Sequence, residues 1–362
     1  MNKYLNFLLF FLLIGFSCAQ AENNSFKLRL KKNQQIEQLN TVGFDLYFDV
    51  SEDYTTKIRQ QFIINPTAEN GMLFQVLNGL SINKPAFSGS LQTRTLSTVI
   101  DTNQNNSTVQ QKSKCQKCSL QENLINNFTL TYHADKPEKN YTNLPIPFEF
   151  DKFGRENNST IQIATDGTLL NVENIEQLIA ERFAEEGLPD ELKAQILSVF
   201  GAFYQAIPEM KIPTYLTGIH LPSATRQVGD SWTQKVLTVP SEFVSKMSEK
   251  DQQLLSLTDE KITLSHREKG AATFYVELPV VQKQEFTTPD DALKISFNGV
   301  LLSGDMKIDE ATGLLTEAEL ISDFTITISK IEGHPSPALD EMPNQVTFRF
   351  NATIGTETRI GA

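Results

Sequence analysis

Residues 314–331 read LLTEAELISDFTITISKI, and from Phe324 to Ile328 apolar and hydroxyl-bearing side chains alternate without a break. Successive side chains of an extended strand point to opposite faces. The period-two pattern therefore predicts a β-strand with one face on a core and the other in water. A strand of this length needs a cover for its apolar face, so the stretch also predicts packing against further elements.

Similar segments surround this stretch and predict a long antiparallel meander from Val228 to Ile360. Lys269-Gly270 and Ala311-Thr312-Gly313 supply turn signals between them. The N-terminal region adds segments of the same kind, whereas the polar run at 101–123 predicts a long exposed loop. The predicted strands are 26–30, 42–50, 57–64, 72–82, 91–100, 127–132, 159–164, 232–239, 261–266, 272–279, 293–302, 304–309, 314–331 and 345–354.

Residues 172–206 interrupt the strands with apolar residues at helical spacing. Gly187 matches a helix C-terminal cap, and Pro189 matches the first turn of a second helix. The pattern predicts a helical hairpin that packs on the sheet or, alternatively, forms a movable lid over an apolar cavity. The candidate lid or core residues are Phe183, Leu192, Ile196, Phe200 and Phe203.

Together these patterns predict an α+β protein, mainly antiparallel β, in which long meander sheets, or a half-barrel, are covered by the helical hairpin. The sequence leaves open whether the two β-rich regions form one sheet or two. The expected organisation is a signal peptide at 1–21, a β-rich region at 22–165 with the polar loop, a hairpin and connector at 166–224, and the meander at 225–362.

The first 21 residues have the pattern of an export signal. Lys3 precedes an apolar stretch at 5–16, and Ala19-Gln20-Ala21 matches the small-residue motif of signal peptidase. The apolar stretch is shorter than the roughly 20 residues of a membrane-spanning helix. We therefore expect a periplasmic or extracellular protein. Cys18 offers an alternative, since lipidation there makes an outer-membrane lipoprotein and the only expected contact with a membrane.

The charge and the cysteines limit the expected chemistry. A formal net charge of −12 disfavours nucleic acid as a partner. Cys115 and Cys118 are candidates for a local disulfide or incidental thiols. The alternatives are a metal site, or a redox pair whose thiol pKa values are lowered by neighbouring lysines. The four histidines are isolated in sequence, and we predict no metal, no cofactor and no catalytic residue.

Val228-Gly229-Asp230-Ser231-Trp232 is the most distinctive motif, and it contains the single tryptophan of the chain. Trp232 is expected to anchor the core, with ligand stacking as the alternative. Together with 28–33, the helical stretch and the turn at 304–315, the motif resembles a bacterial exported family of unknown function. That resemblance implies an exported, β-rich protein. A looser likeness links the meander and its helical cover to periplasmic lipoprotein carriers, at the level of fold alone.

These features favour a non-enzymatic exported protein that binds an apolar small molecule or an envelope protein. One alternative is a secreted hydrolase with dispersed carboxylates, since a glycosidase pair is distant in sequence. The other is a structural component of the envelope. A cavity lined by Phe and Leu distinguishes the binding protein from both.

Overall fold

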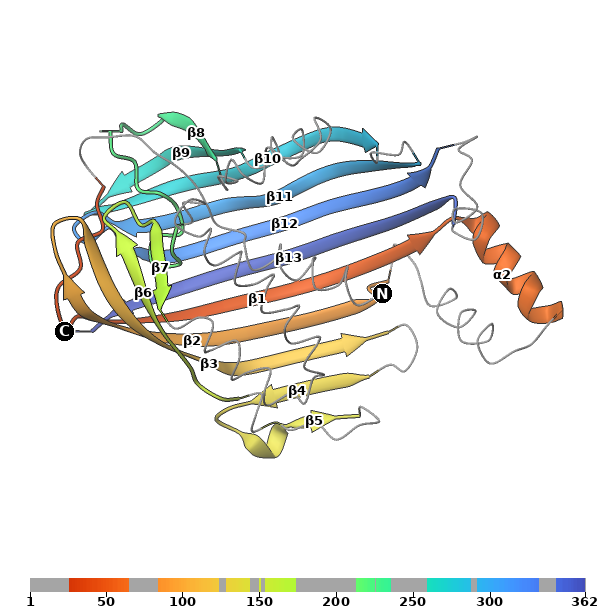
Figure 1. Cartoon of the computed structure of the whole chain (residues 1–362), viewed down its shortest axis with the longest axis horizontal. Coiled ribbons are helices and arrows are strands. Elements are labelled where there is room, and N and C mark those ends of the chain that lie inside the picture. The colour runs from red at the N-terminus through yellow and green to blue at the C-terminus, as the bar shows by residue number, and fades with distance from the viewer. Residues whose placement is uncertain are drawn as a thin grey trace.

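The computed structural model describes residues 26–64, 84–123, 128–143, 150, 154–173, 213–224, 226–235, 259–287, 292–331 and 343–361. Within them, 13 strands form one sheet (Figure 1). The strands are β1 (Gln35–Val50), β2 (Phe87–Thr102), β3 (Asn106–Glu122), β4 (Thr129–His133), β5 (Tyr141–Thr142), β6 (Asn157–Ala164), β7 (Leu169–Glu173), β8 (Ser231–Lys235), β9 (Asp259–Glu268), β10 (Ala271–Thr287), β11 (Leu293–Asp309), β12 (Leu315–Lys330) and β13 (Gln345–Ile360). The helices with described bounds are α2 (Glu52–Ile64) and the 3-10 turn η1 (Pro137–Lys139).

The sheet is open and antiparallel, and its strand order is β5-β4-β3-β2-β1-β13-β12-β11-β10-β9-β8. The hairpin β6–β7 branches from β3. The two β-rich regions of the sequence form one sheet, because β1 pairs with β13 along almost its whole length, from Ile36↔Ile360 to Val50↔Val346. The prediction of a mainly antiparallel β protein is therefore confirmed.

The two faces of the sheet differ in chemistry. Cross-strand partners point to the same face of the sheet. The register of β1 with β13 and β2 therefore identifies which residues of those strands share each face with β1. We call the face that bears Ile36, Phe44 and Leu46 the apolar face. The opposite, polar face carries hydroxyl, amide and charged side chains such as Thr41, Asp45, Arg94, Lys117, Asp323, Arg349 and Thr353.

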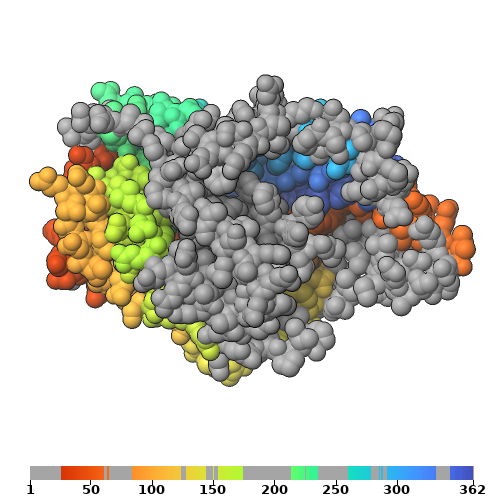
Figure 2. Space-filling view, viewed as in Figure 1, coloured from red at the N-terminus to blue at the C-terminus, as the bar shows by residue number. Residues whose placement is uncertain are grey.

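Three chain segments seal one end of the apolar face: residues 26–30, β6–β7 and residues 213–222. Backbone hydrogen bonds join them to one another and to the sheet, including Leu28 N to Thr165 O at 2.7 Å and Leu315 N to Leu216 O at 2.8 Å. Figure 2 shows β6–β7 in yellow-green over the left end of the sheet. The core beneath includes Phe26, Leu28, Ile36, Val99, Ile163, Leu216, Ile219, Ile262, Phe274, Met306, Ile308 and Leu320.

Two strand predictions in the C-terminal region merge into one element. The predicted strands 293–302 and 304–309 are the single strand β11, which contains a bulge between Val300 and Ser303. Gly304 has a φ of 147°, and a Cβ there would lie 2.1 Å from Glu319 O. Only glycine allows β11 and β12 to approach this closely at that point. The turns at Lys269-Gly270 and 311–313 are confirmed, with positive φ at Gly270 and Gly313.

The predicted polar loop at 101–123 is wrong. A short turn at 103–105 leads into the 17-residue strand β3, which pairs with β2, β4 and β6. Its polar residues suit a strand for two reasons. Lys112, Lys114 and Lys117 lie on the polar face, and Ser113 on the apolar face bonds Thr95 Oγ1 at 2.8 Å. Pairing with neighbouring strands therefore satisfies the hydrogen-bonding groups of a segment that has too few apolar residues to be predicted as a strand.

The predicted strand at 57–64 is also wrong, because these residues belong to α2. Acidic Glu52 and Asp53 in the first turn favour the positive end of the helix dipole. The Tyr54 N–H donates to Ser51 O at 3.1 Å, which closes the first turn.

The predicted helical hairpin falls mainly on residues 174–212, which lie outside the described residues. Val172, the expected start of its first helix, belongs to strand β7. The predicted strand at 72–82 and the predicted signal peptide with Cys18 also lie outside. Among the described residues, no helix combines the length and the apolar character needed to cross a membrane.

Candidate functional site

Phenylalanine rings gather on the apolar face of the central strands, away from the sealed end. Phe44, Phe48, Phe87, Phe324, Phe348 and Phe350 surround Leu46 and Ala352, and we call this group the phenylalanine cluster. Ring centroids lie 5.0 Å apart for Phe48 and Phe348, and 5.4 Å apart for Phe324 and Phe350. Four strands supply these rings, β2, β1, β13 and β12, because the register aligns Leu46 with both Phe87 and Phe350.

The phenylalanine cluster remains partly accessible. Phe350 and Leu46 are buried, whereas the other five rings keep part of their surface exposed. Leu91, which shares the apolar face through its pairing with Val42, is 36% exposed. The apolar face is thus closed at one end and accessible at its centre. The sequence contains this signal, since apolar residues recur at every second position from 42 to 48 and aromatic residues stand at 348 and 350, but their convergence depends on the β1–β13 register.

A band of uncharged polar side chains separates the phenylalanine cluster from the sealed core. The band comprises Gln38, Asn40, Thr93, Thr95, Ser97, Gln111, Ser113, Thr356 and Thr358 on β1, β2, β3 and β13, all on the apolar face. We call it the polar band. Its sequence signal is weak, because single polar residues in a strand also fit a solvated face.

Hydrogen bonds of Tyr215 connect one edge of the polar band to the segment 213–222. Its hydroxyl lies 2.7 Å from Ser97 Oγ and accepts a hydrogen bond from Gln111 Nε2. Gln38 Nε2 donates to Tyr215 O at 3.1 Å, but the buried Gln38 Oε1 has no partner among the described residues. Burial raises the pKa of Tyr215 above its ordinary value, so the phenol stays protonated.

Trp232 stands at the other side of the sealed core, on β8. Its ring lies 6.0 Å from Phe274 in an edge-on arrangement, and Phe274 contacts Phe26 in the same way at 5.2 Å. The Arg226 guanidinium lies 4.7 Å from the Trp232 ring centroid. These contacts fit the predicted core anchor, and Gly229, with a φ of 97°, makes the turn that precedes the strand.

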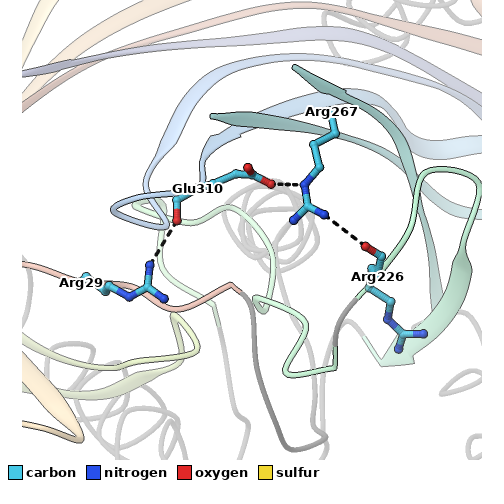
Figure 3. Close-up of polar contacts among 4 residues, drawn as sticks. All are labelled: Arg29, Arg226, Arg267 and Glu310. Carbon is cyan, nitrogen blue, oxygen red and sulfur yellow. Dashed lines mark hydrogen bonds and ion pairs between the residues drawn. The ribbon is translucent and has the colours of Figure 1, made fainter. Parts of the chain in front are cut away.

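A chain of arginine contacts connects this corner to the turn between β11 and β12 (Figure 3). Arg267 Nε pairs with Glu310, and an Arg267 terminal nitrogen donates to Arg226 O at 3.4 Å. Arg29 donates to the backbone oxygen of Glu310 at 3.2 Å. Arg267 also lies over the Phe26 ring, 5.3 Å from its centroid. These charged residues therefore pack against the outer edge of the aromatic core. Their contacts with the rings and with each other are sufficient to account for their position.

Glu260 and Gln234 form a buried pair beside this corner. Gln234 Nε2 donates to Glu260 Oε2 at 3.0 Å, and Glu260 is 3% exposed. Gln234 and Glu260 are cross-strand partners on β8 and β9, two positions along from the pair Trp232 and Ile262. They therefore lie on the same face of the sheet as Trp232 and Ile262. Burial raises the pKa of Glu260 to about 7, and the hydrogen bond from Gln234 opposes this shift only in part. Sequence reasoning missed this carboxyl, because nothing local distinguishes it from a solvated one.

Cys115 and Cys118 both lie on β3 as free thiols. A bulge at Gln116 places both on the apolar face, since Cys115 pairs with Thr93 and Cys118 with Leu91. Burial raises both thiol pKa values, that of Cys118 to about 11, with a smaller contribution from Cys115. The predicted lowering of these pKa values by nearby lysines is wrong, because the lysines lie on the opposite face.

We expect Cys118 in a Cys115→Ser variant to react with iodoacetamide at pH 8 on the order of 100-fold more slowly than a free cysteine, since the thiolate is the reactive form. Mass spectrometry of the alkylated protein over time measures the rate. In urea the rate should return to that of an unfolded thiol. A fast reaction in the folded state contradicts the burial of Cys118. For the wild type, full protection of both cysteines even in urea identifies a disulfide instead.

The polar face has a hollow of its own, of about 430 Å³, around Gly43. Hydroxyl and amide side chains of neighbouring strands contribute to its lining, and Ser90 Oγ lies 2.7 Å from Ser119 Oγ. The residues that line the hollow are Gly43, Phe44, Asp45, Ser88, Gly89, Ser90, Ser119, Leu120, Gln121, Thr129, Asn351, Ala352 and Thr353. Asp45 is the one ionisable residue among them.

The other residues considered from the sequence are dispersed. Among the described residues, no group of three or more His, Cys, Asp or Glu side chains converges as metal ligands do. Asp309 stabilises its own turn, accepting from Thr312 N at 2.8 Å. His220 Nδ1 lies 3.0 Å from Thr168 Oγ1 in the core. The predicted lid residues Phe183, Leu192, Ile196, Phe200 and Phe203 and the lipidation candidate Cys18 lie outside the described residues.

Comparisons by sequence find no relative of this chain. No family model matches the chain, and no curated protein matches it. Among solved structures, the enduracididine biosynthesis enzyme MppR complexed with pyruvate aligns over 91% of each chain, with 6% identity and a TM-score of 0.11. A TM-score this low carries no argument about fold or function.

Proposed function

We propose that this chain is an exported, non-enzymatic protein that binds an apolar small molecule against the phenylalanine cluster. One observation carries the proposal: the apolar face is sealed at one end, yet its aromatic centre stays partly accessible around Leu91. Apolar surface of this kind on one face of a sheet favours a ligand that removes it from water.

The magnitudes are adequate for such a role. Burial of a methylene group contributes about 0.8 kcal/mol, so about ten methylenes contribute about 8 kcal/mol, the free energy that corresponds to micromolar affinity before the costs of association. The proposal that the protein is exported is supported by the signal-peptide pattern of residues 1–21. The apolar stripe of the predicted helical hairpin, Phe183 to Phe203, supports a cover for the bound molecule.

We expect the purified protein to bind the hydrocarbon probe diphenylhexatriene with a rise in fluorescence. Phe324→Ala should weaken binding about tenfold, since loss of ring contact removes on the order of 1–2 kcal/mol. Phe324→Leu, which keeps more apolar surface, should lie between this variant and the wild type. Fluorescence titration measures the Kd of each.

Ile321→Ala is the matched control. Ile321 lies on the same strand, three residues from Phe324, but on the polar face, where it is 54% exposed. Its replacement should leave the Kd unchanged, and thermal melting should confirm that all variants are folded at the assay temperature. Absence of probe binding by the wild type, or equal effects of Phe324→Ala and Ile321→Ala, would disprove the proposal.

A further inference from the structure

Asn40 and Thr93 form the accessible part of the polar band. They are cross-strand partners on β1 and β2, and each keeps part of its surface exposed. Asn40 Oδ1 accepts a hydrogen bond from Thr356 Oγ1 at 2.9 Å, and the Asn40 amide hydrogens have no acceptor within the described part of the chain. Among the described residues, the Thr93 hydroxyl has no hydrogen-bond partner either. This pair thus presents both donors and an acceptor on a face that is otherwise apolar.

A second observation indicates that this region lacks a polar partner. Gln38 lies two residues before Asn40 on the same face of β1, is fully buried, and has an acceptor oxygen with no donor in the ranges that the structure describes. A buried acceptor without a donor is destabilising, because it has lost its hydrogen bond to water without gaining another. Two neighbouring amides on β1 therefore have unused hydrogen-bonding capacity next to the accessible apolar surface at Leu91.

The position of this pair suits the polar end of a single-chain lipid. From Asn40 to Phe44 the strand rises about 13 Å, and to Phe48 about 26 Å, at roughly 3.3 Å per residue. One leaflet of a bilayer is about 15 Å of hydrocarbon, since the whole core is about 30 Å thick. A lipid chain that starts at Asn40 therefore passes Val42 and reaches the phenylalanine cluster at Phe44.

The electrostatics of the face favour an uncharged polar end. The register places the Asn40–Thr93 pair between neighbours that carry no charge: Gln38, Val42, Leu91, Thr95, Cys115, Cys118, Ile354, Thr356 and Thr358. The nearby cations of β2 and β3, such as Arg94 and Lys114, lie on the opposite face. A carboxylate or phosphate here would lose water without gaining a counter-charge from these described neighbours, which disfavours its binding.

From these observations we infer that the ligand is an uncharged single-chain lipid, whose hydroxyl or amide end binds Asn40 and Thr93 while its hydrocarbon chain lies on the phenylalanine cluster. The inference rests on the proposed function and specifies its ligand class.

Displacement of diphenylhexatriene by two lipids of equal chain length tests the inference. We expect 1-monolauroylglycerol to compete at least tenfold more effectively than laurate at pH 8, both below their critical micelle concentrations. Asn40→Leu and Thr93→Val should each weaken monolauroylglycerol threefold to tenfold, the range of one neutral hydrogen bond, and leave the Kd of diphenylhexatriene unchanged. Thr41→Val, on the polar face of the same strand, is the control and should change neither value.

The outcomes separate the two proposals. If diphenylhexatriene fails to bind, the proposed function is wrong and the inference falls with it. If the probe binds and Phe324→Ala weakens it, but laurate competes as well as monolauroylglycerol, the proposed function stands and the uncharged ligand is wrong. Unchanged monolauroylglycerol affinity in both Asn40→Leu and Thr93→Val also overturns the inference.

Discussion

Replacement of Phe274 by alanine is expected to lower the free energy of unfolding by about 3–5 kcal/mol. Phe274 is fully buried at the sealed end of the apolar face, and its ring contacts both Phe26 and Trp232. Truncation leaves a cavity between the N-terminal segment and the strands β8–β10. Because β10 is hydrogen-bonded to β9 on one side and to β11 on the other, its backbone has little freedom to move into the cavity. Urea denaturation, followed by the fluorescence of the single tryptophan, measures the change.

Tyr275→Ala is the matched control for this substitution. Tyr275 is the next residue of β10, points to the other face and is 40% exposed. Its truncation should cost about 1 kcal/mol or less, as exposed side chains usually do. Equal losses for the two variants would contradict the assignment of Phe274 as the centre of the sealed core.

Glu260→Gln is expected to stabilise the protein at pH 8 by up to roughly 3 kcal/mol relative to the wild type. The pKa of Glu260 in the folded protein is about 7, against an ordinary value of 4.5. Between these pH values the folded state binds more protons than the unfolded state, so stability falls as the pH rises. The destabilisation is absent below about pH 4.5 and complete above about pH 7. Glutamine keeps the hydrogen bond from Gln234 without a charge.

Urea denaturation of wild type and variant at several pH values from 4.5 to 8 measures this effect. The difference between the two proteins should grow with pH and level off above pH 7, while pH effects of other groups cancel in the comparison. Glu319→Gln, at an exposed position of the polar face, should show no such trend. A constant difference between wild type and Glu260→Gln across the range would show that the pKa of Glu260 is not raised in the folded protein.

The strands that were predicted correctly share a property: their patterns are local. Phe324 to Ile328 alternates strictly, and the structure has β12 over this stretch. The turns at Gly270 and Gly313 were also predicted, because positive φ selects glycine over other residues. The predicted strand at 42–50 is part of β1, and it supplies Phe44 and Phe48 to the phenylalanine cluster.

The errors arise where partners distant in sequence outweigh local composition. Strand β3 reads as a polar loop, yet β2, β4 and β6 satisfy its backbone and its polar side chains. From the sequence alone, the lysines beside Cys115 and Cys118 predict activated thiols. A single bulged residue, Gln116, instead places both thiols on the apolar face. No property of Gln116 marks it as the bulge, because a bulge depends on the register with the neighbouring strand.

The sequence by itself determined that the chain forms long, two-faced antiparallel strands, because the alternation of side chains across a strand is a property of the extended backbone alone. Only the tertiary structure decided that one sheet includes both halves of the chain, because the β1–β13 pairing joins residues as distant as Ile36 and Ile360. The β1–β13 pairing also brings Leu46 and Phe350 together, the β1–β2 pairing places Asn40 opposite Thr93, and the β8–β9 pairing places the buried Glu260 opposite Gln234. Each of these positions depends on register, and register is set by contacts between strands rather than within them.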